Sequence, residues 1–296
     1  MKKPSVALMR ICSLSASLLF AFIAVPCQVK AATSIENDRY ALNVEATDGT
    51  FTIATKPSGK IILPAGKLSG TGGTAKTIEL ADKTLGKGQG IEVTYADGNR
   101  EVVALYPDLP FVTFRSTLHN GGKEPVVLNH VPTVSVGVDL GKPLAEISTL
   151  GTGGLLAPAQ NPGSYAFLSI VDPSTRSGVV GGWLTHDRGS GVVFSPVKDD
   201  AVRMQAQIDY GCLRIKPGED ATAEMFAIGY FDDARFGLEA YADAIGKIYA
   251  VKLLPQMAGL CTWYMDRHAA ACNEVQLKEL TADCAKELKD FGFNFI

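Results

Sequence analysis

The sequence predicts a mainly β protein with a large antiparallel β-sandwich, a linker helix and a parallel β-α-β unit. Three observations predict this order. Short segments of alternating apolar and polar residues, separated by glycine, proline, aspartate and asparagine, dominate residues 33–231. A helical period replaces this alternation at residues 234–252. A continuous apolar run, a helical pattern and a second apolar run then close the sequence.

The composition is that of a globular protein without a surface for nucleic acid. The 296 residues are 46% hydrophobic and carry a formal net charge of −3, with lysine and arginine scattered along the chain. Because nucleic-acid recognition requires a clustered basic surface, we expect no nucleic-acid partner. The length suits one large or two ordinary domains with well-buried cores.

Residues 1–31 have the three-part layout of a secretory signal peptide. Two lysines and Arg10 precede the apolar run ICSLSASLLFAFIAVPC, and small side chains follow at Val29 and Ala31. We expect cleavage near Ala31 and a periplasmic or secreted bacterial protein that has no membrane contact after cleavage. An uncleaved anchor is disfavoured, because the run is shorter than the roughly 20 residues of a spanning helix and Pro26 interrupts it.

Residues 32–231 are predicted to form the sandwich domain. Residues 91–95, 101–106 and 111–118 alternate in polarity and are separated by ADGN, PDLP and HNGG, which tolerate turn geometry. Turn sequences at such regular spacing favour antiparallel strands in two sheets. Further strands are predicted at residues 133–140, 165–171, 177–185, 191–197, 202–208, 212–216 and 223–231. The sequence has no repeat of fixed period, so we expect neither a propeller nor a solenoid.

Residues 232–256 are predicted to be a linker helix and its connection to the next unit. Leu238, Tyr241, Ile245 and Ile248 recur at helical spacing, so their stripe is expected to lie against the sandwich. Asp232 or Asp233 is available as the N-cap.

The last forty residues predict a strand, a loop, a helix and a second strand. AGLCTWYM is an apolar run of the kind found in strands buried on both faces. Asn273 and Gln276 form a variant capping box, and Gly292 suits a helix end in the left-handed conformation. FNFI then follows as a strand that a crossover helix places parallel to the first.

Such a unit should not be stable alone, because two strands and one helix leave an apolar face uncovered. We therefore expect the chain to be a fragment of a longer protein. The alternative is a native product that borrows strands from a partner.

The residues GLCTWY and LKDFGFNFI, preceded by a sandwich and a LEAYADAIGK helix, resemble the melibiase-type α-galactosidases and raffinose-synthase-like proteins of glycoside hydrolase family 36. In that family a GWCSWY-like strand opens a (β/α)8 barrel. The resemblance therefore implies that residues 257–296 are the truncated start of a catalytic barrel. This sequence departs from the pattern at Leu260, where the family often has tryptophan.

The resemblance implies a retaining glycosidase that acts on terminal α-galactosides. Its nucleophile and its acid/base are carried by later barrel strands, so no catalytic residue is assigned here and the chain alone is predicted to be inactive. Trp263 matches the family tryptophan at the end of the first strand and could stack on a galactose ring. Tyr264 and Asp266, in the loop that follows, are the other candidate substrate-binding residues. Core packing is the competing role for Trp263, and solvation for the loop residues.

No cofactor or metal is predicted. Neither His119, His130 and His186 nor the cysteines have metal-ligand or triad spacing. The cysteines that remain after signal cleavage are interpreted as ordinary buried thiols, namely Cys212, Cys261, Cys272 and Cys284. Trp183 is interpreted mainly as a core residue, with a reach to the sugar site as the alternative.

Two functions stay open from the sequence. The first is the N-terminal part of an exported α-galactosidase-like hydrolase whose partner is a carbohydrate substrate. The second is a non-catalytic carbohydrate-binding or assembly sandwich. The strand, loop and helix pattern of the last forty residues favours the hydrolase. The scarcity of tryptophan in the sandwich weakly disfavours a dedicated sugar-binding face. The oligomeric state stays open.

Overall fold

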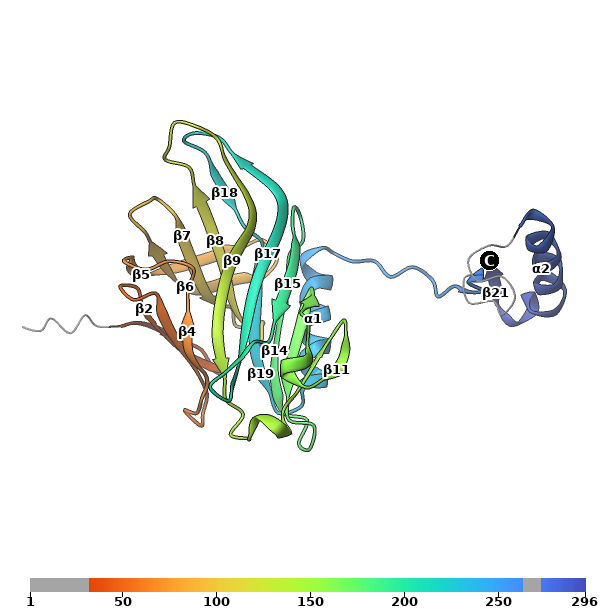
Figure 1. Cartoon of the computed structure of the whole chain (residues 1–296), viewed down its shortest axis with the longest axis horizontal. Helices are drawn as coiled ribbons and strands as arrows, with labels where there is room; N and C mark the ends of the chain where they lie inside the picture. The colour runs from red at the N-terminus through yellow and green to blue at the C-terminus, as the bar shows by residue number, and fades with distance from the viewer. Residues whose placement is uncertain (1–31, 263–272) are drawn as a thin grey trace, which may run out of the picture.

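Two large antiparallel sheets form the body of the protein (Figure 1). The computed structural model describes residues 32–262 and 273–296, so the predicted signal peptide lies outside the described residues. Within the described residues, a nine-stranded sheet has the order β1-β2-β3-β4-β9-β17-β15-β12, and β16 pairs with β17. A ten-stranded sheet has the order β11-β10-β13-β14-β19-β8-β7-β6-β5, and β18 pairs with β8. The prediction of a mainly β chain is confirmed.

The strands of the nine-stranded sheet are β1 (Thr33–Glu36), β2 (Tyr40–Glu45), β3 (Thr50–Thr55), β4 (Ile61–Lys67), β9 (Val126–Val138), β12 (Ser164–Tyr165), β15 (Ser190–Phe194), β16 (Val197–Lys198) and β17 (Ala201–Ile215). Those of the ten-stranded sheet are β5 (Thr74–Asp82), β6 (Gly86–Thr94), β7 (Arg100–Leu105), β8 (Val112–His119), β10 (Ser148–Gly151), β11 (Gly154–Leu156), β13 (Phe167–Val171), β14 (Gly178–Trp183), β18 (Asp220–Thr222) and β19 (Phe226–Phe231). Short 3₁₀ turns lie at Leu144–Glu146 and Pro158–Gln160.

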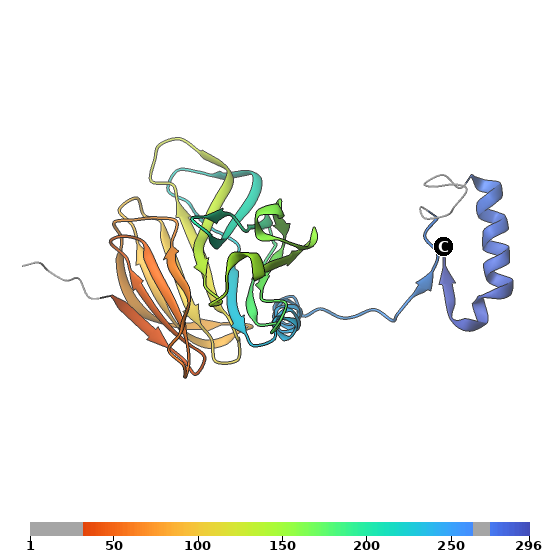
Figure 2. The same ribbon diagram turned by 60° about the horizontal axis from the view of Figure 1, so that its bottom comes forward.

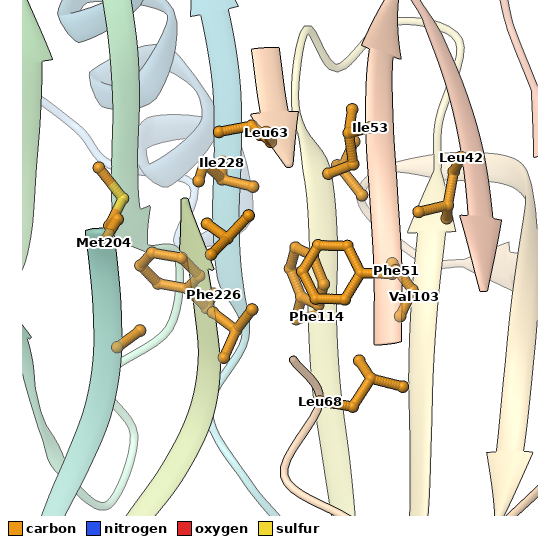
Figure 3. Close-up of a cluster of buried hydrophobic side chains, with 14 of the residues drawn as sticks. Leu42, Phe51, Ile53, Leu63, Leu68, Val103, Phe114, Met204, Phe226 and Ile228 are labelled. Atoms are coloured by element: carbon orange, nitrogen blue, oxygen red, sulfur yellow. The ribbon is translucent and has the colours of Figure 1, made fainter. Parts of the chain in front are cut away.

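The main hydrophobic core lies between the two sheets, where alternate residues of each strand meet (Figure 3). Phe51 of β3 packs against Phe114 of β8 with ring centroids 5.1 Å apart. Met204 of β17 and Phe226 of β19 are fully buried in the same cluster. The alternation that predicted the strands is therefore the pattern that builds this core.

One strand expected from the sequence is divided by the tertiary structure. Residues 165–171 were predicted as a single strand, but Ala166 has a φ of 64° and separates β12 from β13. Ala166 donates its N–H to Gly191 of the nine-stranded sheet and accepts from the N–H of Trp183 in the ten-stranded sheet. The chain crosses between the sheets at this residue, and these two bonds hold it in a conformation that is strained for a residue with a Cβ.

Helix α1 (Ala234–Ile248) covers the outer face of β14 and β19, as Figure 2 shows from below. Asp233 is its N-cap, and its side chain accepts from the N–H of Arg235. The predicted stripe packs as expected, with Tyr241 buried and the other members partly buried beside it. A Cβ on Gly182 of β14 would lie 2.5 Å from the Tyr241 ring, so the helix needs glycine there for its close approach.

Replacing Tyr241 by phenylalanine should lower the free energy of unfolding by about 1 kcal/mol, because its buried hydroxyl group donates to a backbone carbonyl. That hydroxyl lies 2.8 Å from the carbonyl oxygen of Trp183 and 3.2 Å from that of Ala166. The measurement is the midpoint of urea unfolding followed by circular dichroism. Tyr165→Phe is the matched control, since Tyr165 is 66% exposed. Equal midpoints for the two variants would contradict the anchoring role of Tyr241.

An extended segment leads from α1 to a small C-terminal unit, as Figures 1 and 2 show. The unit contains β20 (Ala258–Gly259), α2 (Glu274–Glu287), a 3₁₀ turn at Lys289–Phe291 and β21 (Phe293–Phe295). β20 and β21 pair in parallel, as predicted. Gly292 has a φ of 88°, in the left-handed region expected for it. Whether the unit starts a (β/α)8 barrel stays a prediction.

The expected burial of the first of these strands is wrong. Ala258 and Gly259 are exposed, because within the described residues a two-stranded sheet and one helix cannot cover both strand faces. The cysteine interpretation is also wrong in part, since Cys212 and Cys261 are exposed free thiols, whereas Cys284 is buried. Cys272 lies outside the described residues. Across residues 32–262 and 273–296, no helix has the length and apolar character needed to cross a membrane.

Candidate functional site

The sequence predicts a substrate site in the segment that follows β20, at the carboxyl edge of the parallel pair β20 and β21. Ala258 pairs with Phe293 and Gly259 with Phe295. Leu260 continues the pairing, and its N–H donates to the carbonyl oxygen of Phe295 over 3.2 Å. Because the two strands run in the same direction, the segments that leave them do so at one edge of the sheet.

The three predicted substrate-binding residues follow β20 along the chain. Trp263, Tyr264 and Asp266 fall within residues 263–272 and so lie outside the described residues. The described residue Leu260, which precedes these positions in the chain, lies beside β21 through its hydrogen bond to Phe295. Substrate binding by these three residues stays a prediction.

Helix α2 precedes β21 in the chain and begins with the capping box that the sequence predicts. The Asn273 side chain accepts from the N–H of Gln276, and the Gln276 side chain accepts from the N–H of Asn273. A cavity of about 560 Å³ beside α2 and β21 is lined by Thr281, Cys284, Ala285, Lys289, Gly292, Phe293, Asn294, Phe295 and Ile296. Among the described residues this lining holds no Asp or Glu side chain, so it lacks the pair of side-chain carboxyl groups that glycoside hydrolysis ordinarily uses.

Large apolar side chains are exposed around this unit. Leu253 is 92% exposed, Leu254 is 79% exposed and Phe291 is 86% exposed. Such residues usually lie in protein interiors, and a surface of this kind suits contact with further protein structure better than contact with a polar sugar.

A buried carboxylate in the sandwich was missed by the sequence analysis. Glu101 of β7 is 4% exposed and lies between the sheets. Its Oε1 accepts from the N–H and the hydroxyl group of Ser69, and its Oε2 accepts from the hydroxyl group of Tyr95 over 2.8 Å. Burial raises the pKa of Glu101, although these hydrogen bonds act in the opposite direction. The signal was available, because Glu101 shares its strand face with the core residues Val103 and Leu105.

A second buried carboxylate, Glu224, holds the loop that follows β14. It accepts from the hydroxyl group of Thr185 and from the N–H of Arg188. Tyr249, directly after α1, binds the same loop: its hydroxyl group accepts from the N–H of His186 over 2.7 Å and donates to Asp187 over 3.0 Å. These contacts fix the point at which the chain leaves the sandwich, and both oxygens of Glu224 are occupied.

The histidines of the sandwich do not assemble into a triad within the described residues. Nδ1 of His119 lies 2.7 Å from Oδ1 of Asp220, and Nδ1 of His130 lies 2.6 Å from Oδ1 of Asp209. The first pair joins β8 to β18 and the second joins β9 to β17, so each links neighbouring strands. No group of three or more His, Cys, Asp or Glu side chains that could hold a metal occurs in the described part of the chain.

Trp183 is a core residue, as its main interpretation predicted. It is 0% exposed, its indole N–H donates to the carbonyl oxygen of Val192 and its ring packs edge-on against Phe226. The alternative reading, in which Trp183 reaches a sugar, is wrong because full burial leaves no ring surface for a ligand.

Comparison with known proteins finds no matching family model and no matching curated protein. Solved structures with a similar fold include a galactose mutarotase related enzyme from Lactobacillus acidophilus, with 11% identity and a TM-score of 0.47 over 68% of this chain and 97% of that one. They also include an α-galactosidase from Lactobacillus brevis, with 9% identity and a TM-score of 0.48 over 86% of this chain and 47% of that one.

A third neighbour is the α-galactosidase AgaA of glycoside hydrolase family 36 from Geobacillus stearothermophilus, solved in complex with raffinose. It is 12% identical, with a TM-score of 0.46 over 86% of this chain and 48% of that one. The chain thus spans about half the length of the α-galactosidases that it matches.

Proposed function

We propose that this chain is the N-terminal part of an exported, retaining α-galactosidase-like glycoside hydrolase that acts on terminal α-galactosides. One observation carries the proposal. The parallel pairing of β20 and β21 across helix α2 occurs where the sequence resembles the first β-α-β unit of the family 36 barrel. The sandwich and helix α1 precede this unit in the order that the resemblance implies.

The proposed roles of the residues follow from the chemistry of retaining glycosidases. They require two carboxyl groups roughly 5–5.5 Å apart across the anomeric carbon, one as nucleophile and one as acid/base. In a barrel enzyme these groups lie at the carboxyl ends of strands, and we assign them to strands that would follow β21. Trp263 would stack on the sugar ring, and Tyr264 and Asp266 would contact its hydroxyl groups from the first loop.

We expect the 296-residue chain to release no nitrophenol from an aryl α-galactoside. The reason is that its described residues bring no pair of free carboxylates to the carboxyl edge of β20 and β21. A version extended along the reading frame beyond Ile296 should turn the substrate over. The matched control is an aryl α-glucoside, which differs only in the configuration at carbon 4 and should be a poor substrate of the extended protein.

Two results would count against the proposal. Turnover of the α-galactoside by the chain itself would show that the catalytic carboxylates are not supplied by later strands. A stop codon directly after Ile296, with no activity, would remove the enzyme assignment and leave the non-catalytic sandwich as the function to test.

A further inference from the structure

A cavity on the outer face of the ten-stranded sheet has no role in the proposed function. On β8, Phe114 points into the inter-sheet core, so its neighbours Thr113 and Arg115 face the other way. In the register of β7 and β8, Val102 pairs with Arg115 and Ala104 with Thr113. A cavity of about 210 Å³ lies over these pairs, lined by Leu80, Ala81, Asp82, Val102, Ala104, Tyr106, Thr113, Arg115, Thr117 and Met225.

Glycines on β6 make room for this cavity. A Cβ on Gly88 would lie 2.6 Å from the Tyr106 ring, and a Cβ on Gly90 would lie 3.0 Å from the Leu80 side chain. Without side chains at these two positions, Tyr106 and Leu80 can lie across the sheet and form walls. The cavity therefore depends on the two glycines of β6 and on the side chains of Leu80 and Tyr106 that lie over them.

Arg115 places a positive charge in the wall of this cavity. Its side chain is partly buried, and its Nε donates to the carbonyl oxygen of Ala223 over 3.1 Å, which holds the guanidinium plane in place. Among the described residues it makes no ion pair, and its terminal nitrogens have no hydrogen-bond partner. A partly desolvated charge without a partner is costly, and a bound carboxylate would supply two parallel hydrogen bonds.

Asp82 supplies an acceptor on another wall of the same cavity. Its Oδ1 accepts from the N–H groups of Thr84 and Leu85, both over 2.8 Å, which orients the carboxylate and leaves Oδ2 available. Tyr106 is close to both charges: burial is the main cause of its raised pKa, Asp82 raises that pKa further and Arg115 lowers it. The cavity thus combines a fixed cation, a fixed anion and a buried phenol.

We propose that this cavity binds a small polyhydroxylated carboxylate of the size of a single sugar acid, with its carboxylate on Arg115 and a hydroxyl group on Asp82. The volume is below the roughly 300–1,000 Å³ of sites for drug-sized ligands, which limits the occupant to a small molecule. The unpaired guanidinium selects a carboxylate, and Asp82 selects a hydroxyl donor. Leu80, Val102 and Met225 provide apolar walls for the ring carbons.

The test is titration calorimetry of the whole chain with galacturonate and with galactose, which differ only at carbon 6. Galacturonate should bind at one site, and galactose should bind at least about tenfold more weakly because it cannot pair with Arg115. Arg115→Gln should weaken galacturonate binding by at least about tenfold. Arg214→Gln is the matched control, an exposed arginine on β17 of the other sheet, and should bind as the unmodified protein does.

A second variant keeps the test decisive if Arg115→Gln does not fold. Asp82→Asn retains the Oδ1 acceptor for the two backbone N–H groups, so it should fold and yet lose affinity for galacturonate. Galacturonate binding that is absent, that is matched by galactose, or that survives both substitutions unchanged overturns the proposal. The α-galactoside assay does not report on this cavity, so failure here and failure of the proposed function are distinguishable.

Discussion

Replacing Trp183 by alanine should lower the free energy of unfolding of the sandwich by about 3–5 kcal/mol, the cost typical of removing a buried aromatic side chain. The indole belongs to β14 of one sheet and lies against β15 of the other, where a Cβ on Gly191 would be only 2.1 Å from its ring. It also packs against Phe226, with ring centroids 5.2 Å apart. Its loss would open a cavity that rigid sheets on both sides cannot close.

The measurement is equilibrium unfolding in urea followed by far-ultraviolet circular dichroism, because Trp183 is one of only two tryptophans and its removal changes the fluorescence signal. Phe236→Ala on α1 is the control, since that ring is 62% exposed and its removal should change stability by no more than about 0.5 kcal/mol. Similar midpoints for the two variants would show that the indole does not bridge the sheets.

Replacing Glu101 by alanine should lower the free energy of unfolding by about 3 kcal/mol at neutral pH. The change leaves the buried hydroxyl group of Tyr95 without its acceptor, and it also removes the acceptor of the exposed Ser69. Each buried group left unpaired costs about 1–3 kcal/mol. Glu101→Gln retains an acceptor oxygen and should cost less than Glu101→Ala.

The contribution of Glu101 to the free energy of unfolding should change with pH in one direction. Because burial raises the pKa of Glu101 above its ordinary value, the folded state binds a proton that the unfolded state has released. This contribution to stability is complete below the unfolded pKa and is lost as the pH rises towards the raised folded pKa. Glu101→Gln has no such proton to lose, so the stability of the variant relative to the unmodified protein should increase with pH across that window.

Urea unfolding of both proteins at several pH values from about 4.3 upwards, the ordinary pKa of glutamate, tests this sign. A constant difference between the two proteins would mean that the pKa of Glu101 is the same in the folded and unfolded states. A difference that changes in the opposite direction would mean that the hydrogen bonds from Ser69 and Tyr95 outweigh burial.

Local signals in the sequence were sufficient for several elements. The helical spacing of Leu238 and Tyr241 predicted the covered face of α1, and Asp233 was one of its two predicted caps. Asn273 predicted the start of α2, and Gly292 predicted the left-handed residue, which ends the 3₁₀ turn that follows α2. These features depend on residues a few positions apart, so the sequence contains the interactions that produce them.

Strand boundaries were less predictable where distant segments decide them. Residues 202–208 and 212–216 were predicted as two strands, but β17 is continuous because β9 pairs with both parts across a bulge. Conversely, Ala166 divides one predicted strand, because its backbone bonds Gly191 and Trp183 in different sheets. Alternation of polarity cannot report either event, since it describes one strand at a time.

The sequence by itself determined the class of the fold, the position of the linker helix and the parallel β-α-β pattern at residues 257–296, because periodicity and capping are local properties. Only the tertiary structure decided the order of the strands, the hydrogen-bond partners of Glu101 and the meeting of Asp82, Tyr106 and Arg115 around one cavity. Those features arise from contacts between segments far apart in the chain. Their energies depend on burial and on partners that no short stretch of sequence specifies.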